Sequence, residues 1–162
     1  MTYLFDNETE VVLSFDMKDV GKEVILHTLE FLKCPYEVEI SLLITDNSNI
    51  KELNRDFREI DKATDVLSFP MIDFSEECQY DSVTEDDFNP DTGEIMLGDI
   101  VISVNAVIDQ AREYGHAVRR EYTFLIVHSV LHLFGYDHIL EEDRKCMEEK
   151  QKEIMEYLGI SR

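Results

Sequence analysis

The sequence predicts a single α+β domain in which a small, mixed, four-stranded sheet packs against helices. Three observations support this fold class. Segments rich in β-branched residues alternate with helical patterns in the first half of the chain, and the second half is mainly helical. The chain has 162 residues, 44% of them hydrophobic, which is enough for one core. No repeat or linker divides residues 1–162, so we expect one domain.

Four short strands are expected, at residues 10–15, 36–45, 65–69 and 95–104. The first (EVVLSF) is rich in β-branched and aromatic residues. The second becomes fully apolar toward its end, which is typical of a buried strand. Pro70 follows the third and cannot donate a ladder hydrogen bond, which favours an edge strand or a strand end. In the fourth, Gly98 marks the expected position of a bulge.

Five helices are expected, at residues 18–33, 46–57, 105–114, 118–134 and 141–158. The first has apolar residues at helical spacing and stops before Pro35. The second begins with Asp and Asn residues that can cap a helix N-terminus. The last three stop at Gly115, Gly135 and Gly159, and glycine just past a helix is a common end signal.

Residues 72–93 are predicted to form a long acidic surface loop, because they contain Pro90 and Gly93 and lack a clear hydrophobic period. Between Met71 and Asp99 there are ten acidic residues and no Lys or Arg. Like charges without basic partners are hard to bury. We therefore expect an exposed, mobile segment that contributes little to folding.

Composition restricts the possible partners and the location. The formal net charge of −21 should repel nucleic acid at long range, so only a local basic site could contact phosphates. No apolar run is long enough to cross a bilayer, and the acidic N-terminal residues do not resemble a signal peptide. Cys34, Cys78 and Cys146 form no CxxC pair and are expected to be free thiols. These features predict a cytoplasmic protein without a membrane partner.

Three of the five histidines occur in one motif, HSVLHLFGYDH. His128 and His132 are four residues apart on a predicted helix, so their imidazoles share one face. Gly135 lets the chain leave the helix, and His138 follows three residues later. Three imidazole nitrogens at about 2.0–2.1 Å suit Zn²⁺, and three protein ligands leave a fourth position open, as in catalytic zinc sites. A lone buried histidine is usually a core residue bonded to a carbonyl group, but three in this spacing predict one zinc ion per chain.

The histidine spacing matches the metzincin pattern HExxHxxGxxH, including the position of Gly135, so we expect a metzincin-like zinc helix. The residue at the position of the protease general base is Ser129 instead of Glu. A serine cannot accept a proton from water at neutral pH, which disfavours protease chemistry. Asp137 lies beside a ligand and could either orient an imidazole or cap the helix that follows.

Three stretches of the chain resemble the YbeY family, bacterial metal-dependent endoribonucleases of ribosomal RNA maturation. HSVLHLFGYDH resembles the family's zinc motif HGxLHLxGYDH, with Ser129 in place of Gly. LNRDFREIDKATDVLSFP, at residues 53–70, resembles LNxxYRxxDxxTDVLSFP, with Phe57 as the aromatic residue. LGDIVIS, at residues 97–103, also matches. The resemblance spans most of the chain after residue 53, in the family's order.

The resemblance implies a single-strand-specific endoribonuclease that trims the 3′ end of small-subunit ribosomal RNA and helps to remove defective ribosomes. It also implies a catalytic role for Arg58, which stands at the family's arginine position. Taken alone, an Arg at the end of a short helix is usually a solvated charge. Beside a zinc site, its guanidinium could clamp a phosphate and stabilise charge in the transition state. The metal would act as a Lewis acid. No general base is evident in the sequence. Asp65 and Ser68 could line the same cleft.

Two other functions stay open. A non-catalytic, zinc-containing ribosome assembly factor is favoured by the acidic charge, because a ribosome-associated protein with a basic surface could recruit the chain. Hydrolysis of another bond, such as a peptide or a small amide, is the third hypothesis. The open fourth position on the metal favours an enzyme.

Overall fold

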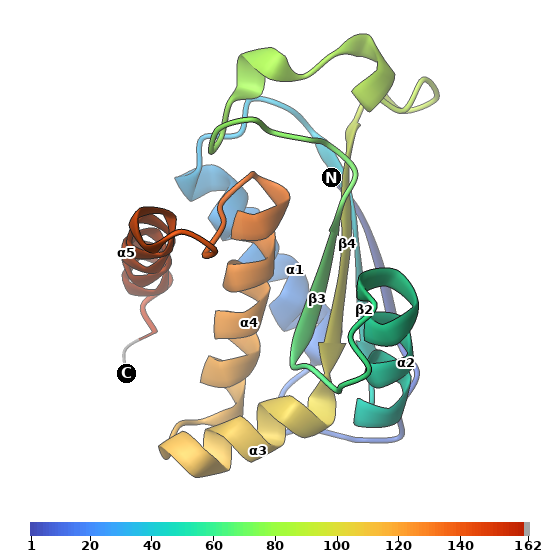
Figure 1. The fold of residues 1–162 in the computed structure, drawn as a ribbon, viewed down its shortest axis with the longest axis vertical. Helices are drawn as coiled ribbons and strands as arrows, with labels where there is room; N and C mark the ends of the chain where they lie inside the picture. The colour runs from blue at the N-terminus through green and yellow to red at the C-terminus, as the bar shows by residue number, and fades with distance from the viewer. Residues whose placement is uncertain (161–162) are drawn as a thin grey trace.

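A four-stranded mixed sheet forms the central layer of the computed structural model, which describes residues 1–160 (Figure 1). Its strands are β1 (Thr2–Asn7), β2 (Val38–Thr45), β3 (Val66–Pro70) and β4 (Ile95–Ser103). The order is β1-β2-β4-β3; β2 runs parallel to β1 and β4, and β3 lies antiparallel to β4 at the edge. The predicted α+β class with a small mixed sheet is confirmed.

Among residues 1–160, the α-helices are α1 (Met17–Phe31), α2 (Asn47–Arg58), α3 (Val104–Tyr114), α4 (Val118–Leu133) and α5 (Glu141–Tyr157). Helices α1, α4 and α5 lie on one side of the sheet and α2 lies on the other (Figure 1). The predicted bounds are accurate to within about two residues, because local capping sets them: Asp16 and Asp46 accept backbone hydrogen bonds at the starts of α1 and α2. None of these helices is both long and apolar enough to span a membrane.

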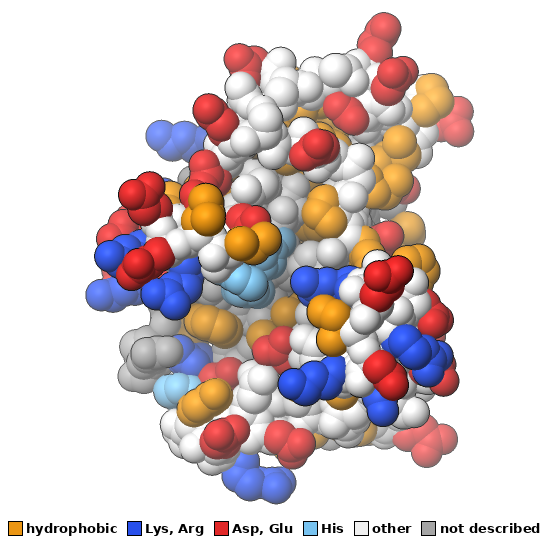
Figure 2. Space-filling view, viewed as in Figure 1, with side chains coloured by type: hydrophobic (Ala, Val, Ile, Leu, Met, Phe, Trp, Pro, Cys, Tyr) orange, Lys and Arg blue, Asp and Glu red, His pale blue; other side chains and the backbone are white. Residues whose placement is uncertain are grey.

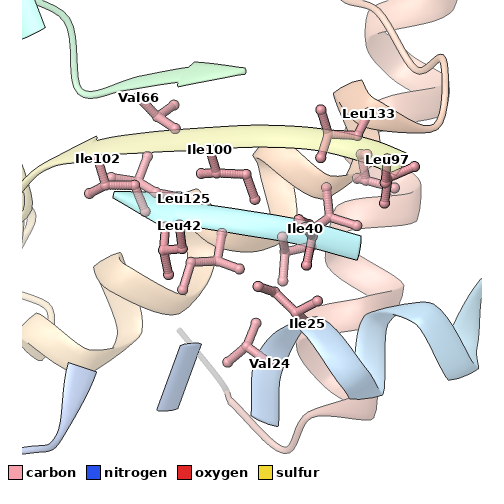
Figure 3. Packing of buried hydrophobic residues seen from close by; sticks show 14 of the residues in the cluster. Val24, Ile25, Ile40, Leu42, Val66, Leu97, Ile100, Ile102, Leu125 and Leu133 are labelled. Atoms are coloured by element: carbon pink, nitrogen blue, oxygen red, sulfur yellow. The ribbon is translucent and has the colours of Figure 1, made fainter. Parts of the chain in front are cut away.

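The main core lies between the sheet and the helices α1 and α4. The sheet contributes almost completely buried side chains from β2 and β4, which are Ile40, Leu42, Ile100 and Ile102 (Figure 3). Buried side chains of the two helices pack around them: Val24, Ile25, Leu125 and Leu133. Helix α4 is buried around most of its circumference, which is typical of a central helix. On the opposite face, Ile50 of α2 packs with Leu67 and Val101 in a smaller cluster.

The strand predicted at residues 10–15 is wrong, because the first strand is Thr2–Asn7. Residues 2–7 pair with residues 39–44 along almost the whole length of β2, so this edge of β2 is not available to residues 10–15. Their apolar side chains, Val11, Leu13 and Phe15, pack against the core without a ladder. One-sided burial therefore produces the same alternating pattern as a strand does.

The bulge predicted at Gly98 is present. The pairing of β2 with β4 shifts register so that Glu39 opposes Met96 and Ile40 opposes Gly98. Gly98 has a φ of +145°, and a Cβ atom there would collide with the carbonyl oxygen of Phe69 on β3. A glycine is required at this position because the two strands approach closely.

The segment between β3 and β4 is anchored by its apolar residues, which corrects the expectation that residues 72–93 contribute little to folding. It contains two short 3₁₀ turns, Tyr80–Ser82 and Glu85–Asp87. Most of its acidic side chains are exposed, but Ile72 and Phe74 are buried in the main core. The Tyr80 hydroxyl donates a hydrogen bond to the Leu32 carbonyl at 2.5 Å. Buried apolar residues that are irregularly spaced, as here, give no hydrophobic periodicity that could be recognised in the sequence.

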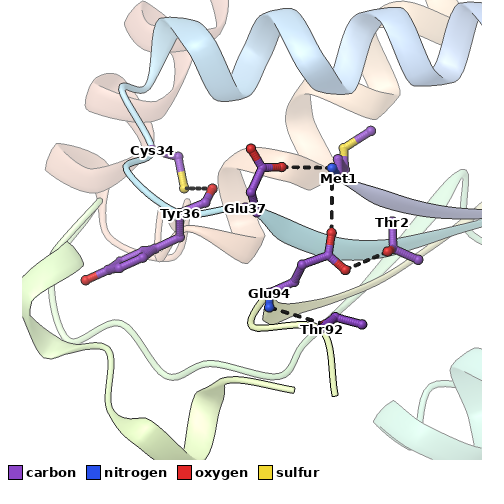
Figure 4. Close-up of polar contacts among 7 residues, drawn as sticks. All are labelled: Met1, Thr2, Cys34, Tyr36, Glu37, Thr92 and Glu94. Carbon is purple, nitrogen blue, oxygen red and sulfur yellow. Dashed lines mark hydrogen bonds and ion pairs between the residues drawn. The ribbon is translucent and has the colours of Figure 1, made fainter. Parts of the chain in front are cut away.

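Glu94, at the end of this segment, is a buried acidic residue. Its carboxylate accepts a hydrogen bond from the Thr2 hydroxyl and lies 3.6 Å from the amino group of Met1 (Figure 4). The same amino group donates to Glu37 at 2.8 Å. These contacts connect the acidic segment to the beginnings of β1 and β2.

Candidate metal centre

Helix α4 and the turn after it bring three histidines together. The Nε2 atoms of His128 and His132, one helical turn apart, lie 3.2 Å from each other. The ring centroid of His138 lies 5.7 Å from that of His128 and 5.0 Å from that of His132. One ligand atom from each histidine lies within 4.8 Å of the other two. The side chains therefore converge as the spacing of the motif requires.

The turn that carries His138 depends on a glycine and an aspartate. Gly135 has a φ of +95°, and a Cβ atom there would lie 2.9 Å from the Cβ of Phe74. The Asp137 carboxylate accepts a hydrogen bond from the backbone N–H of His138 at 2.7 Å. The interpretation of Asp137 as a helix cap is wrong, because α5 is preceded by Leu140 and has no side-chain cap. Asp137 instead stabilises the backbone at the third histidine.

Two hydrogen bonds determine which imidazole nitrogens face the cavity. His132 Nδ1 lies 2.9 Å from the carbonyl oxygen of Tyr136, which can only accept, so this Nδ1 carries the hydrogen. His128 Nδ1 lies 3.4 Å from Gln151 Oε1, and Gln151 Nε2 donates to the Phe124 carbonyl at 2.8 Å. The amide oxygen is thus the acceptor for His128. Both Nε2 atoms consequently direct lone pairs toward each other.

The two helix histidines are neutral and fit a metal ion. Burial lowers the pKa of His128 below its usual value, and burial, followed by the proximity of His128, lowers that of His132 to about 4. Two zinc–nitrogen bonds of about 2.0–2.1 Å at a tetrahedral angle require nitrogens about 3.3–3.4 Å apart. The observed separation of 3.2 Å agrees with this requirement. A cation would also satisfy two facing lone pairs that have no hydrogen between them.

The histidines line a cavity of about 820 Å³ that extends to β3 and to the end of α2. Figure 2 shows pale blue histidine side chains near the centre of this face. Arg58, the last residue of α2, lines the same cavity and is exposed. Its neighbours Lys51 and Arg55 pair with Asp61 and Asp56, whereas Arg58 has no acidic partner within 4 Å among residues 1–160. Its guanidinium is therefore available to an anion in the cavity.

Asp65 and Ser68 line the cavity from β3 and the turn before it. The Asp65 carboxylate accepts hydrogen bonds from the Val66 backbone N–H at 2.8 Å and from Gln110 Nε2 at 3.1 Å. The Ser68 hydroxyl bonds with that of Ser129, which is completely buried. Ser129, at the position of the metzincin general base, therefore forms a buried hydrogen bond between α4 and β3 and does not line the cavity.

Gln151 contacts this site but was not predicted from the sequence. It comes from α5, 23 residues after the histidine that it contacts, so no spacing rule joins the two. A signal does exist: Gln151 shares a buried stripe of α5 with Met147, Ile154 and Met155. An uncharged polar residue on an otherwise apolar stripe indicates a buried hydrogen-bond partner.

Comparison with known proteins gives the family. The sequence model of Endoribonuclease YbeY matches residues 4–159. Proteins of that name from Lachnoclostridium phytofermentans and Agathobacter rectalis are 50% and 48% identical to the chain, with all of both sequences covered in each case.

A solution structure of a protein from Thermotoga maritima shares 27% identity and superposes with a TM-score of 0.60. The match covers 98% of this chain and 90% of that one, so the two proteins share their fold over nearly their whole lengths. The converging histidines lie within the region that the family model matches. The chain belongs to the YbeY endoribonuclease family.

Proposed function

We propose that this chain cleaves single-stranded RNA with one zinc ion held by His128, His132 and His138, during maturation of the 3′ end of small-subunit ribosomal RNA. Membership of the family makes it an endoribonuclease, a hydrolase that acts on RNA phosphodiester bonds. The observation that carries the zinc assignment is the pair of Nε2 lone pairs facing each other at 3.2 Å, each on a ring whose Nδ1 is hydrogen-bonded.

The residues around the metal position have separate tasks. When bound, the metal supplies Lewis acidity toward water and a phosphoryl oxygen. The Tyr136 carbonyl and Gln151 hold two imidazoles in the orientation that exposes Nε2. Arg58 donates two parallel hydrogen bonds to the scissile phosphate and stabilises the charge that develops there.

An unpaired strand suits this site better than a duplex. The metal ligands on α4 are partly buried inside a cavity. A flexible single strand can place one phosphate inside such a cavity and splay its bases apart, whereas the phosphates of a duplex stay on the outside of a rigid helix. We therefore expect single-strand selectivity from the partial burial of His128 and His132 in this cavity.

The acidic charge favours help from a partner. A chain with a net charge of −21 gains little long-range attraction to RNA. We therefore expect a ribosome-associated protein with a basic surface to bring the chain to its substrate, in the cytoplasm where ribosomal RNA is processed. The same charge supports the second candidate function, a non-catalytic zinc-containing assembly factor.

Metal content and RNA cleavage, measured on the same preparations, test the proposal. Purified protein should contain about one zinc ion per chain by elemental analysis, and His128→Ala should lose both zinc and cleavage. Arg58→Ala should keep zinc but lose single-turnover cleavage of a labelled single-stranded RNA by orders of magnitude, because the phosphate clamp is removed. Arg58→Lys should recover only part of the rate, since an ammonium lacks the planar fork.

Arg119→Ala is the matched control, because Arg119 is exposed on α4 and does not line the cavity. Its cleavage should equal that of the unmodified chain. Equal cleavage by all variants would assign the activity to a contaminant and leave the assembly factor as the function. Absence of zinc from active protein would overturn the choice of metal.

A further inference from the structure

The cavity around the histidines has few positive charges with which to hold RNA. Its ionised lining consists of one cation, Arg58, and three carboxylates, those of Asp65, Asp73 and Asp137. With a divalent ion on the histidines, the formal charges of this lining cancel. Phosphate contacts normally supply a large share of nucleic-acid affinity through counterion release. The RNA must therefore be held here mainly by groups other than phosphates.

Exposed apolar side chains lie at, or within two residues of, positions that line this cavity. Phe57, Ile60 and Met71, near the end of α2 and β3, are 67%, 44% and 57% exposed. Ile139 and Leu140, directly after His138, are 80% and 66% exposed. These five are half of the ten large hydrophobic side chains exposed among residues 1–160. Met71 and Ile139 line the cavity itself, and orange side chains border the histidines in Figure 2.

Phe57 combines exposure with a fixed orientation. It precedes Arg58 in the chain, and its ring packs against that of Phe69 on β3, with centroids 5.5 Å apart and planes at 71°. This edge contact restrains the ring while two thirds of the side chain stays accessible. A restrained aromatic ring loses little entropy when a base stacks on it. Each stacked base contributes about 5- to 150-fold in affinity to single-strand binding.

We propose that Phe57 stacks on a nucleobase next to the phosphate that Arg58 contacts, and that Ile139 and Leu140 contact a base on the other side of the metal. The inference rests on the endoribonuclease function proposed for the same cavity. RNA is then held chiefly by its bases. A base inside a duplex already has both faces stacked, so this contact requires an unpaired nucleotide.

A double-mutant cycle between the protein and the RNA tests this contact. Zinc-loaded chain cleaves a labelled single-stranded RNA in single turnover, and the protein concentration giving half the maximal rate is measured. Phe57→Ala should raise that concentration about tenfold and change the maximal rate little. Phe57→Trp should behave like the unmodified chain. The RNA is varied by placing an abasic nucleotide at each position in turn. At one position the missing base should raise the half-saturating protein concentration as much as Phe57→Ala does. With that RNA, Phe57→Ala should cause no further increase.

Two further variants keep the test decisive. Phe57→Leu retains an apolar side chain against Phe69 but cannot stack, so it should show the loss even if Phe57→Ala proves unstable. Tyr114→Ala is the matched control, because Tyr114 is 60% exposed on α3 and does not line the cavity. It should bind and cleave normally.

Two results would overturn the stacking proposal. Phe57→Ala could reach half-saturation at the same protein concentration as the unmodified chain. Alternatively, the effects of Phe57→Ala and of the abasic nucleotide on that concentration could add at every RNA position. A docking site for a protein partner at the same patch would give the first of these results. If no cleavage depends on His128, the endoribonuclease function itself fails, which is a separate outcome from the loss of base contact.

Discussion

The buried amide of Gln151 connects α5 to His128 on α4. It is only 5% exposed, accepts from His128 Nδ1 and donates to the Phe124 carbonyl. An acceptor on the second imidazole nitrogen fixes the tautomer and makes the other nitrogen a better ligand. The carbonyl of Tyr136 does the same for His132 but, as a backbone group, cannot be removed by mutation. Gln151 is therefore the position at which this effect can be measured.

Replacing Gln151 by Leu should lower zinc affinity by about 10- to 100-fold, because His128 loses the acceptor that orients it. Gln151→Glu keeps an acceptor for His128 but loses the donor to the Phe124 carbonyl, so it should bind zinc more tightly than Gln151→Leu. Lys152→Leu, at an exposed position on the same helix, serves as the control. Competition with a chromogenic chelator gives the affinities. Unchanged affinity in Gln151→Leu would show that the amide only fills space.

At the scale of elements, the turn between α4 and α5 positions the third histidine, His138. Gly135 adopts a positive φ and packs against Phe74 of the acidic segment. The acidic segment therefore supports the metal site from outside, although it contributes no histidine.

Gly135→Ala should destabilise the protein by about 1–3 kcal/mol from backbone strain. It should also weaken zinc binding, since a Cβ would clash with Phe74 and displace the turn that carries His138. Gly115→Ala is the comparison: its φ is +67°, but no atom lies within 4 Å of the added Cβ. It should show the strain alone and normal zinc affinity. Urea denaturation and chelator competition measure the two effects. Equal zinc affinity in both variants would contradict the role given to the turn.

Phe74→Ala tests whether the acidic segment is anchored. Phe74 is 6% exposed and packs with Tyr80 and Phe134 at centroid distances of 6.5 and 5.7 Å. Truncating a buried Phe costs about 3–5 kcal/mol, and thermal denaturation should show the loss. Limited proteolysis should then cut residues 75–93 faster than in the unmodified chain. An exposed control, Asp86→Asn, should leave both measurements unchanged. If Phe74→Ala lowered thermal stability only slightly, the segment would contribute little to folding, as the sequence predicts.

For the whole molecule, the decisive quantity is the net charge of −21. A single-strand binder loses about 0.7 in the logarithm of affinity per tenfold rise in salt for each phosphate that it neutralises. With Arg58 as the only basic side chain lining the described cavity, the slope should lie between about −1 and zero. Half-saturation of single-turnover cleavage from about 50 to 300 mM KCl measures it. A slope steeper than about −3 would reveal a basic RNA-binding surface elsewhere.

What the sequence determined by itself was local. The start of α2 followed from the capping residue Asp46, and the ends of the last three helices followed from the glycine stops, because a cap acts within one helical turn. The convergence of His128, His132 and His138 was equally predictable, since a four-residue helical spacing and a short glycine turn leave the side chains few other directions. The bulge at Gly98 was predictable because the glycine itself marks the position, although the Phe69 carbonyl that requires a glycine there comes from β3.

What only the tertiary structure decided depends on partners that are distant in sequence. Residues 2–7, and not residues 10–15, form the edge strand, because pairing with β2 is non-local and the two segments have similar patterns. Burial of Phe74, the contact of Ser129 with Ser68, and the bond from His128 to Gln151 arise where separate elements pack. Arg58 reaches the metal cavity only because α2 ends beside the edge strand β3. Periodicity records which face of a segment is buried, but not which element buries it.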